Sequence, residues 1–214
     1  MMKVSPSFLT ADFTKLYEEI KSVEKAQWLH FDVMDGKFVE KKTYDESVLF
    51  EIKKFSSQFF DCHLMIEHPE QSIEKYIKAG ADLVTFHYEA SSNQILKTIK
   101  LIKDNSCQCG LSIKPDTDVK VLIPYLDQLD LVLIMSVEPG KGGQSFLPSA
   151  LDKISFLNQY RKEHHLSFLL EVDGGINLKT ANLVKQTGVD VIVVGSYIFN
   201  KPDRLKAIEE LENV

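Results

Sequence analysis

Residues 59–88 read FFDCHLMIEHPEQSIEKYIKAGADLVTFHY. A short apolar run over 59–66 predicts a strand, and a helical stretch follows it. Pro69 stands in the first turn of that helix and Gly80 directly after its last residue, which are the positions these two residue types favour. A second short apolar run over 83–88 predicts the next strand. A strand, a crossover helix and another strand imply a parallel sheet.

The same unit repeats from one end of the 214-residue chain to the other, without a Gly/Ser linker or a low-complexity tract. Apolar runs predict strands over 3–7, 28–34, 59–66, 83–88, 108–113, 131–136, 168–173 and 191–194. Amphipathic stretches predict helices over 12–26, 46–54, 69–79, 93–103, 119–126, 148–162, 178–186 and 202–211. Eight such units favour an α/β fold of the (β/α)8 TIM-barrel type, with residues 1–214 as a single catalytic domain. The alternative, a doubly wound open sheet, usually has five or six strands.

Composition narrows the class of protein. Apolar residues make up 44% of the chain, enough for a large core, and the formal net charge is −6. This acidic balance argues against a nucleic-acid-binding surface. No apolar run is long enough for a membrane span, and the N-terminal residues lack a secretory signal pattern. The odd count of three cysteines suits a reducing compartment. We therefore expect a cytoplasmic protein with no nucleic-acid or membrane partner.

Ionisable residues lie at the ends of three predicted strands. Side chains alternate along a strand, so His30 and Asp32 share one face of the second strand. His63 and Asp173 end the third and seventh strands. Because active sites of TIM barrels lie at the carboxyl ends of the strands, we expect these four residues to converge on one divalent metal ion, either Zn, Fe, Mn or Co. The alternative is four hydrogen-bonded strand-end residues without a ligand role, and the sequence leaves His87 undecided.

Methionines and glycines mark the same end of the predicted barrel. Met34, Met65 and Met135 end the second, third and sixth strands, where they either line a substrate or fill the core. Glycine-rich loops follow the last three strands. Their backbone N–H groups suit a phosphate group, although the glycines could equally be ordinary loop residues. The loop residues in question are Gly142, Gly143, Gly174, Gly175, Gly195 and Ser196.

With these residues assembled, the sequence resembles the ribulose-phosphate 3-epimerase family over almost its whole length. The motifs that carry the resemblance are SPSFLTADF at 5–13, HFDVMDGKFV at 30–39, DCHLMI at 61–66, PE at 69–70, AGAD at 79–82, HYEA at 87–90, MSVEPG at 135–140, GGQ at 142–144, VDGGI at 172–176 and GS at 195–196.

The resemblance implies an isomerase of the pentose phosphate pathway and carbohydrate metabolism, which epimerises a ketose phosphate at carbon 3 through an enediolate. It implies that one divalent metal ion is held by His30, Asp32, His63 and Asp173, with the two aspartates as the acid–base pair. It further implies that Ser7 and the three methionines line the substrate, that the loop glycines with Ser196 hold the phosphate, and that the protein is a homo-oligomer.

Departures from the family pattern leave the substrate open. Residues 40–44 and 114–117 differ from the usual motifs, and Lys141 stands where the family has Phe. We expect D-ribulose 5-phosphate to be converted to D-xylulose 5-phosphate. One alternative is a hexulose 6-phosphate such as D-allulose 6-phosphate, and another is an inactive barrel that binds a sugar phosphate. A decarboxylase related to orotidine monophosphate decarboxylase is disfavoured, because Met34 stands where that group needs Lys.

Overall fold

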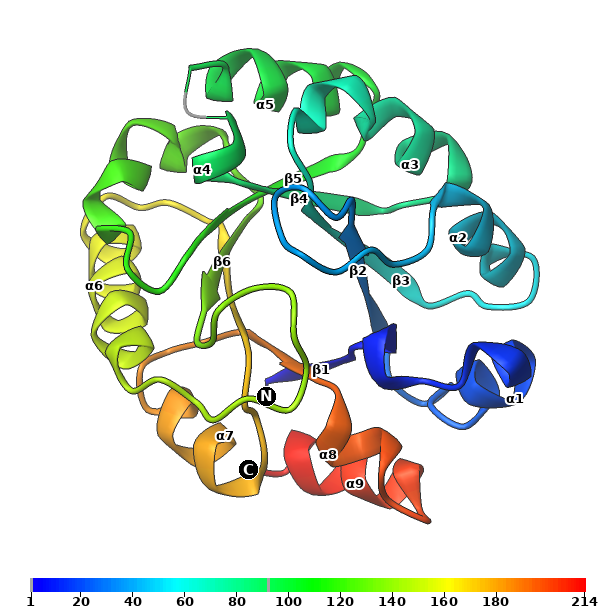
Figure 1. Cartoon of the computed structure of the whole chain (residues 1–214). Helices are drawn as coiled ribbons and strands as arrows, with labels where there is room; N and C mark the ends of the chain where they lie inside the picture. Colours follow the sequence, from blue (N-terminus) through cyan, green and yellow to red (C-terminus); the bar gives the residue numbers. More distant parts are fainter. Residues whose placement is uncertain (1, 92) are drawn as a thin grey trace.

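The computed structural model describes residues 2–91 and 93–214, and their strands form one parallel sheet inside a ring of helices (Figure 1). The eight strands of this described part of the chain are β1 (Lys3–Pro6), β2 (Trp28–Met34), β3 (Phe59–Met65), β4 (Leu83–His87), β5 (Gln108–Ile113), β6 (Leu131–Met135), β7 (Leu169–Asp173) and β8 (Val191–Val194). Their order in the sheet is β1-β8-β7-β6-β5-β4-β3-β2.

The two edge strands, β1 and β2, meet and nearly close the sheet into a barrel. Ser7 forms a parallel bridge with His30 at the carboxyl end of β1. The Ser7 hydroxyl also donates a hydrogen bond to Oδ2 of Asp32, at 2.7 Å. The seam of the barrel therefore lies beside the ionisable cluster expected from the sequence, and the prediction of a (β/α)8 barrel is confirmed.

Helices follow the strands in turn, although several differ from the predicted ranges. The α-helices in the described residues are α1 (Leu16–Lys21), α2 (Glu46–Lys53), α3 (Ile73–Ala79), α4 (Tyr88–Ser91), α5 (Ile95–Asp104), α6 (Ser149–Glu163), α7 (Leu178–Lys185), α8 (Ser196–Phe199) and α9 (Arg204–Glu212). The four-residue helices α4 and α8 were not predicted, because a single turn shows no hydrophobic period.

Three predicted helices take another form. The helix expected over 69–79 begins as a 3₁₀ turn, Pro69–Gln71, and continues as α3. The helix expected over 12–26 is a 3₁₀ turn, Phe13–Lys15, followed by α1, which already ends at Lys21. The stretch expected to be helical over 119–126 is a 3₁₀ helix, Val119–Gln128, with Pro124 inside it. Proline has no N–H group to donate to the preceding turn, and its ring crowds that turn, so it disfavours a regular α-helix.

The core has two layers because side chains alternate along each strand. Phe31 and Val33 point outward and belong to the large apolar cluster between the sheet and the helices. Leu133 and Met135 belong to a smaller cluster with side chains from β2, β4 and β8. This smaller cluster fills part of the barrel interior, and the polar face of β2 points into the same interior. No helix in the described part of the chain is both long and apolar enough to cross a membrane.

Candidate active site at the carboxyl end of the barrel

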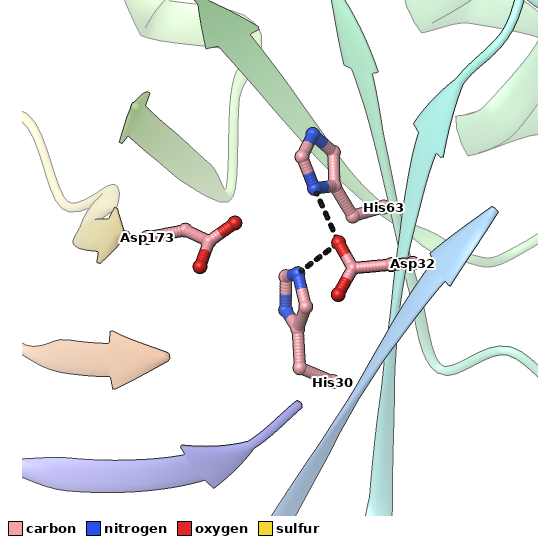
Figure 2. Close-up of side chains that lie close together, drawn as sticks. All are labelled: His30, Asp32, His63 and Asp173. Atoms are coloured by element: carbon pink, nitrogen blue, oxygen red, sulfur yellow. Dashed lines mark hydrogen bonds and ion pairs between the residues drawn. The ribbon is translucent and has the colours of Figure 1, made fainter. Parts of the chain in front are cut away.

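His30, Asp32, His63 and Asp173 come together at the mouth of the barrel. Each offers one ligand atom, and these atoms lie within 4.8 Å of one another. Figure 2 shows Asp173 on the side of the cluster opposite Asp32, with one ring nitrogen of each imidazole turned toward Asp32. The structure therefore brings together the four residues that were predicted from the sequence to bind a metal ion. Their mixed nitrogen and oxygen donors suit a divalent transition metal.

The nitrogen that each imidazole turns toward this cluster follows from its contacts. Nδ1 of His30 lies 2.5 Å from Oδ2 of Asp61, while Nε2 of His30 lies 3.4 Å from Oδ1 of Asp32. Nε2 of His30 is buried and has no hydrogen-bond partner among the residues that the structure describes. His63 turns Nδ1 toward Asp32, at 3.2 Å. A metal ion would satisfy the unpartnered nitrogen of His30, so these residues fit such an ion.

The two aspartates occupy different electrostatic environments. Burial opposes ionisation of Asp32, but His30 and His63 outweigh it and hold the pKa of Asp32 well below its usual value. Burial and the nearby charge of Asp32 raise the pKa of Asp173 to about 7. Opposite displacements of this kind leave one carboxyl ionised while the other holds a proton near neutral pH.

Beneath His30, the barrel interior holds a second pair of acids. Burial opposes the charged form of His30, but the carboxylates of Asp61 and Asp32 outweigh it and keep the pKa of His30 well above its usual value. Burial, followed by the charge of Asp61, raises the pKa of Glu171 well above its usual range. Both oxygens of Glu171 and Oδ1 of Asp61 are buried, and within residues 2–91 and 93–214 they have no hydrogen-bond partner. His30, Asp61 and Glu171 could also converge on one ion.

A pocket of about 280 Å³ opens directly above the ionisable cluster. Asp32 and Asp173 lie in its wall, and so does every residue that the sequence selected for substrate or phosphate binding. Figure 1 shows the loop between β6 and α6 inside the ring of helices, and residues 137–144 of this loop line the pocket. The selected lining residues are Ser7, Met34, Met65, Met135, Gly142, Gly143, Gly174, Gly175, Gly195 and Ser196.

Two of these glycines have backbone conformations that require glycine. Gly174 has a φ of +123°, and a Cβ there would lie 2.5 Å from the side chain of Val137. Gly175 has a φ of +65°, and a Cβ there would lie 2.4 Å from the backbone nitrogen of Phe146. Both values fall where L side chains are strained. The turn after β7 can therefore approach a ligand as bare backbone.

Comparison with known proteins decides the family. The family model described as the ribulose-phosphate 3 epimerase family matches residues 3–199. The chain belongs to the ribulose-phosphate 3-epimerase family. The prediction of this family is confirmed, and with it the prediction of an isomerase, since epimerases are isomerases.

Curated relatives agree over nearly their whole length. The chain is 43% identical over 214 residues to the ribulose-phosphate 3-epimerase of Bacillus subtilis, covering 99% of this chain and 98% of the relative. It is 39% identical to the enzyme of that name from Schizosaccharomyces pombe, covering 99% and 92%. It is 38% identical to the one from Escherichia coli, covering 98% and 94%.

Solved structures of lower identity show the same fold. KGPDC from Streptococcus mutans superposes with a TM-score of 0.75 at 13% identity, covering 100% of this chain and 96% of the other. The 3-hexulose-6-phosphate synthase of Salmonella typhimurium gives a TM-score of 0.70 at 16% identity, covering 99% and 97%. These similarities support the barrel of this family member and carry no conclusion about its chemistry.

Some residues of the site were not selected from the sequence. Asp61 and Glu171 lie two positions before His63 and Asp173, so strand alternation places them on the same inward face. That alternation was a usable signal for both. His87, left undecided, lies with Nε2 at 2.9 Å from Nε2 of His63. Further pocket-lining residues outside the selected set are Leu9, Thr10, Val137, Glu138, Pro139, Gly140, Lys141, Gln144, Ile176, Asn177, Val193 and Tyr197.

Proposed function

We propose that this protein interconverts D-ribulose 5-phosphate and D-xylulose 5-phosphate by metal-dependent epimerisation at carbon 3. The observation that carries the proposal is the pair of carboxylates, Asp32 from β2 and Asp173 from β7, facing one another across a cluster that also contains two imidazoles. The names of the curated relatives support the five-carbon substrate.

Epimerisation needs a proton to leave carbon 3 on one face of the sugar and to return on the other. Asp32 and Asp173 stand on opposite sides of the cluster (Figure 2), so one carboxylate removes the proton and the other, holding a proton, supplies it from the opposite face. The roles exchange in the reverse direction. A bound divalent ion would supply Lewis-acid stabilisation of the negative charge that develops on the substrate oxygens.

Neighbouring side chains prepare the carboxylates for this exchange. The Ser7 hydroxyl donates to Oδ2 of Asp32, which fixes the orientation of that carboxylate. Met34, Met65 and Met135 are almost fully buried and lie in the pocket wall. Their thioethers do not ionise and are only weak acceptors, so they enclose the reacting carbons without competing for the proton.

The loops after β6, β7 and β8 are the proposed phosphate site. Gly142, Gly143, Gly174, Gly175 and Gly195, with Ser196, lie in the wall of the same pocket. Backbone N–H groups of glycine-rich loops bind phosphate in many TIM barrels. We propose a sugar phosphate as the small-molecule partner, one ion of Zn, Fe, Mn or Co as cofactor, a homo-oligomeric state and a cytoplasmic location.

The test is an epimerase assay on the purified protein with D-ribulose 5-phosphate and D-allulose 6-phosphate, each with and without a chelator. We expect higher kcat/KM for the pentulose phosphate, by about 10- to 200-fold, because one methylene-sized difference is worth about 1–3 kcal/mol. We also expect the chelator to abolish turnover. A kcat/KM at least tenfold higher for the hexulose phosphate would overturn the proposal of a five-carbon substrate. Binding of the sugar phosphate without any turnover would identify an inactive barrel.

A further inference from the structure

A chain of three side chains leads away from the proposed metal ligand His63. Nε2 of His63 lies 2.9 Å from Nε2 of His87, the last residue of β4. Nδ1 of His87 lies 3.2 Å from Oε2 of Glu89, in α4. His87 is fully buried and lies outside the four proposed ligands. Two imidazoles joined through their Nε2 atoms require one donor and one acceptor, so Glu89 can decide the direction of this contact.

The carboxylate of Glu89 is held by the loop after β5. Its Oε1 accepts hydrogen bonds from the backbone N–H of Lys114, at 2.8 Å, and from the hydroxyl of Thr117. The ammonium of Lys153 in turn donates to the backbone carbonyls of Lys114, at 3.3 Å, and Thr117, at 2.7 Å. Glu89 is thus a fixed acceptor, with Oε2 directed at His87.

A carboxylate accepts hydrogen bonds and cannot donate them. Nδ1 of His87 must therefore carry a proton and donate it to Glu89. In a neutral imidazole the other nitrogen then carries a lone pair, so Nε2 of His87 accepts from Nε2–H of His63. With its Nε2 proton donated in this direction, His63 has only Nδ1 available as a ligand atom. Nδ1 lies 3.2 Å from Oδ1 of Asp32, and this carboxylate by itself favours a proton on Nδ1. Glu89 and Asp32 therefore favour opposite tautomers of His63, and only the tautomer favoured by Glu89 leaves Nδ1 free for a metal ion.

We propose that Glu89, acting through His87, is a positioning residue that fixes the tautomer of His63 in which Nδ1 is free to bind the metal ion. This inference rests on the proposed function, because it takes His63 as a ligand. Partners of this kind, behind ligating histidines, typically change metal affinity by 10- to 100-fold. The ring of Phe38 packs against that of His87, with centroids 4.8 Å apart, and the side chains of His63 and His87 are fully buried, so water does not compete for their contact.

Replacement of Glu89 by Gln tests the direction of the hydrogen bonds that join Glu89, His87 and His63. The Gln side chain has one acceptor oxygen where Glu89 uses two. If that oxygen still accepts from Lys114 and Thr117, the amide nitrogen faces Nδ1 of His87 and favours a lone pair there. The proton of His87 then moves to Nε2, His63 must accept at its own Nε2, and the His63 proton is placed on Nδ1, where it blocks the metal ion.

The experiment is a double-mutant cycle on zinc affinity, measured by competition with a chromophoric chelator. The variants are Glu89→Gln, His87→Gln and the double variant. The amide oxygen that His87→Gln introduces reaches about where Nε2 of the imidazole stood, and it accepts from His63 whatever residue stands at position 89. We expect Glu89→Gln to weaken zinc binding by about 10- to 100-fold in the presence of His87. In the His87→Gln background we expect Glu89→Gln to change zinc affinity by less than about threefold.

Two further measurements complete the design. Glu19→Gln removes a largely buried carboxylate of α1 that pairs with Arg204. Within the described part of the chain this carboxylate makes no hydrogen bond or ion pair to His63 or His87, so zinc affinity should equal that of the wild type. Nitrogen-15 NMR of the histidine side chains reads the tautomers directly. In the zinc-free wild type, we expect a larger share of His87 to carry its proton on Nδ1 than in zinc-free Glu89→Gln, because no metal ion then imposes the tautomer.

Each outcome bears on one proposal. Wild-type affinity in Glu89→Gln, an equal loss in both backgrounds, or the same His87 tautomer in the zinc-free wild type and zinc-free Glu89→Gln would overturn the role of Glu89. An equal loss in both backgrounds would show that Glu89 only supports the loop after β5. Failure of the wild-type protein itself to bind zinc or another divalent ion would instead overturn the metal site of the proposed function.

Discussion

The ionisation of Glu89 makes the stability of the folded protein depend on pH. Burial of this carboxyl opposes its ionisation, but hydrogen bonds from His87, Thr117 and the backbone of Lys114 outweigh burial and lower the pKa of Glu89 to about 2, from 4.5. A carboxyl with a lowered pKa in the folded state stabilises the fold above its unfolded pKa. That stabilisation is complete above about pH 5 and is lost as the pH falls from 4.5 toward 2.

The magnitude follows from the two pKa values. Lowering a carboxyl pKa from 4.5 to about 2 corresponds to about 3.5 kcal/mol of folding free energy, at about 1.4 kcal/mol per pH unit. The side chain of Glu89 is 21% exposed, so solvent screening reduces this to about 2 kcal/mol. Linkage then assigns about 1 kcal/mol of loss to the interval between pH 6 and pH 3.5. Glu89→Gln cannot lose this contribution, because an amide does not titrate.

The assay is equilibrium unfolding in urea, with a chelator present, at pH 6 and pH 3.5. We expect the stability difference between the wild type and Glu89→Gln to shrink by about 1 kcal/mol at the lower pH. Thr117→Val is the matched control. It keeps the carboxyl and removes one of its hydrogen bonds, so its pH dependence should fall between the other two. A difference that stays constant within about 0.3 kcal/mol would refute a lowered pKa at Glu89.

Three further predictions concern the cluster and the turn after β7. Asp32→Asn and Asp173→Asn should each lower kcat by at least about 100-fold, with metal content measured in parallel. A variant that still exchanges solvent deuterium at carbon 3 without converting the substrate would assign the remaining carboxyl to one face of the sugar. Near-normal turnover in either variant would contradict the two-carboxylate mechanism. Elemental analysis of His63→Ala should show marked metal loss, and full occupancy would remove His63 from the ligand set. Gly174→Ala should destabilise the fold by about 1–3 kcal/mol in urea unfolding, because φ is +123° and a Cβ would lie 2.5 Å from the nearest side-chain atom. A Cβ at Gly143 would meet no atom of the described residues within 4 Å, its chain neighbours aside, so Gly143→Ala should cost less stability; equal losses would rule out the clash.

Much of the barrel could be predicted because strands are short, apolar and regularly spaced. The bounds of β2, β5 and β8 are those expected from the sequence. Local periodicity fails where the backbone departs from a regular helix. Pro124 lies within a 3₁₀ helix, and α4 and α8 are single turns whose conformation depends on the loops and strands around them rather than on a repeating apolar face.

The candidate site could be predicted in part for the same reason. Alternation along a strand shows which residues share a face, and the carboxyl ends of barrel strands meet at one mouth. Alternation says nothing about the register between neighbouring strands. In the structure His30 lies opposite Asp61, and Asp32 lies opposite His63. Because this register decides which carboxylate contacts which imidazole nitrogen, the roles of Asp61 and His87 could not be derived from the sequence alone.

The register also explains why the two proposed imidazole ligands need different partners. His30 is part of the deeper layer, where Asp61 contacts its Nδ1 and leaves Nε2 for the metal ion. His63 is one layer nearer the mouth, and its Nε2 contacts His87 on β4 rather than a carboxylate. Two neutral imidazoles in contact have no preferred direction by themselves, and Asp32 beside Nδ1 of His63 favours the direction that puts a proton on this nitrogen. A charged acceptor beyond His87 favours the opposite direction, which leaves Nδ1 for the metal ion. Glu89 occupies that position, and metal affinity at this mouth therefore depends on residues as far away as α4.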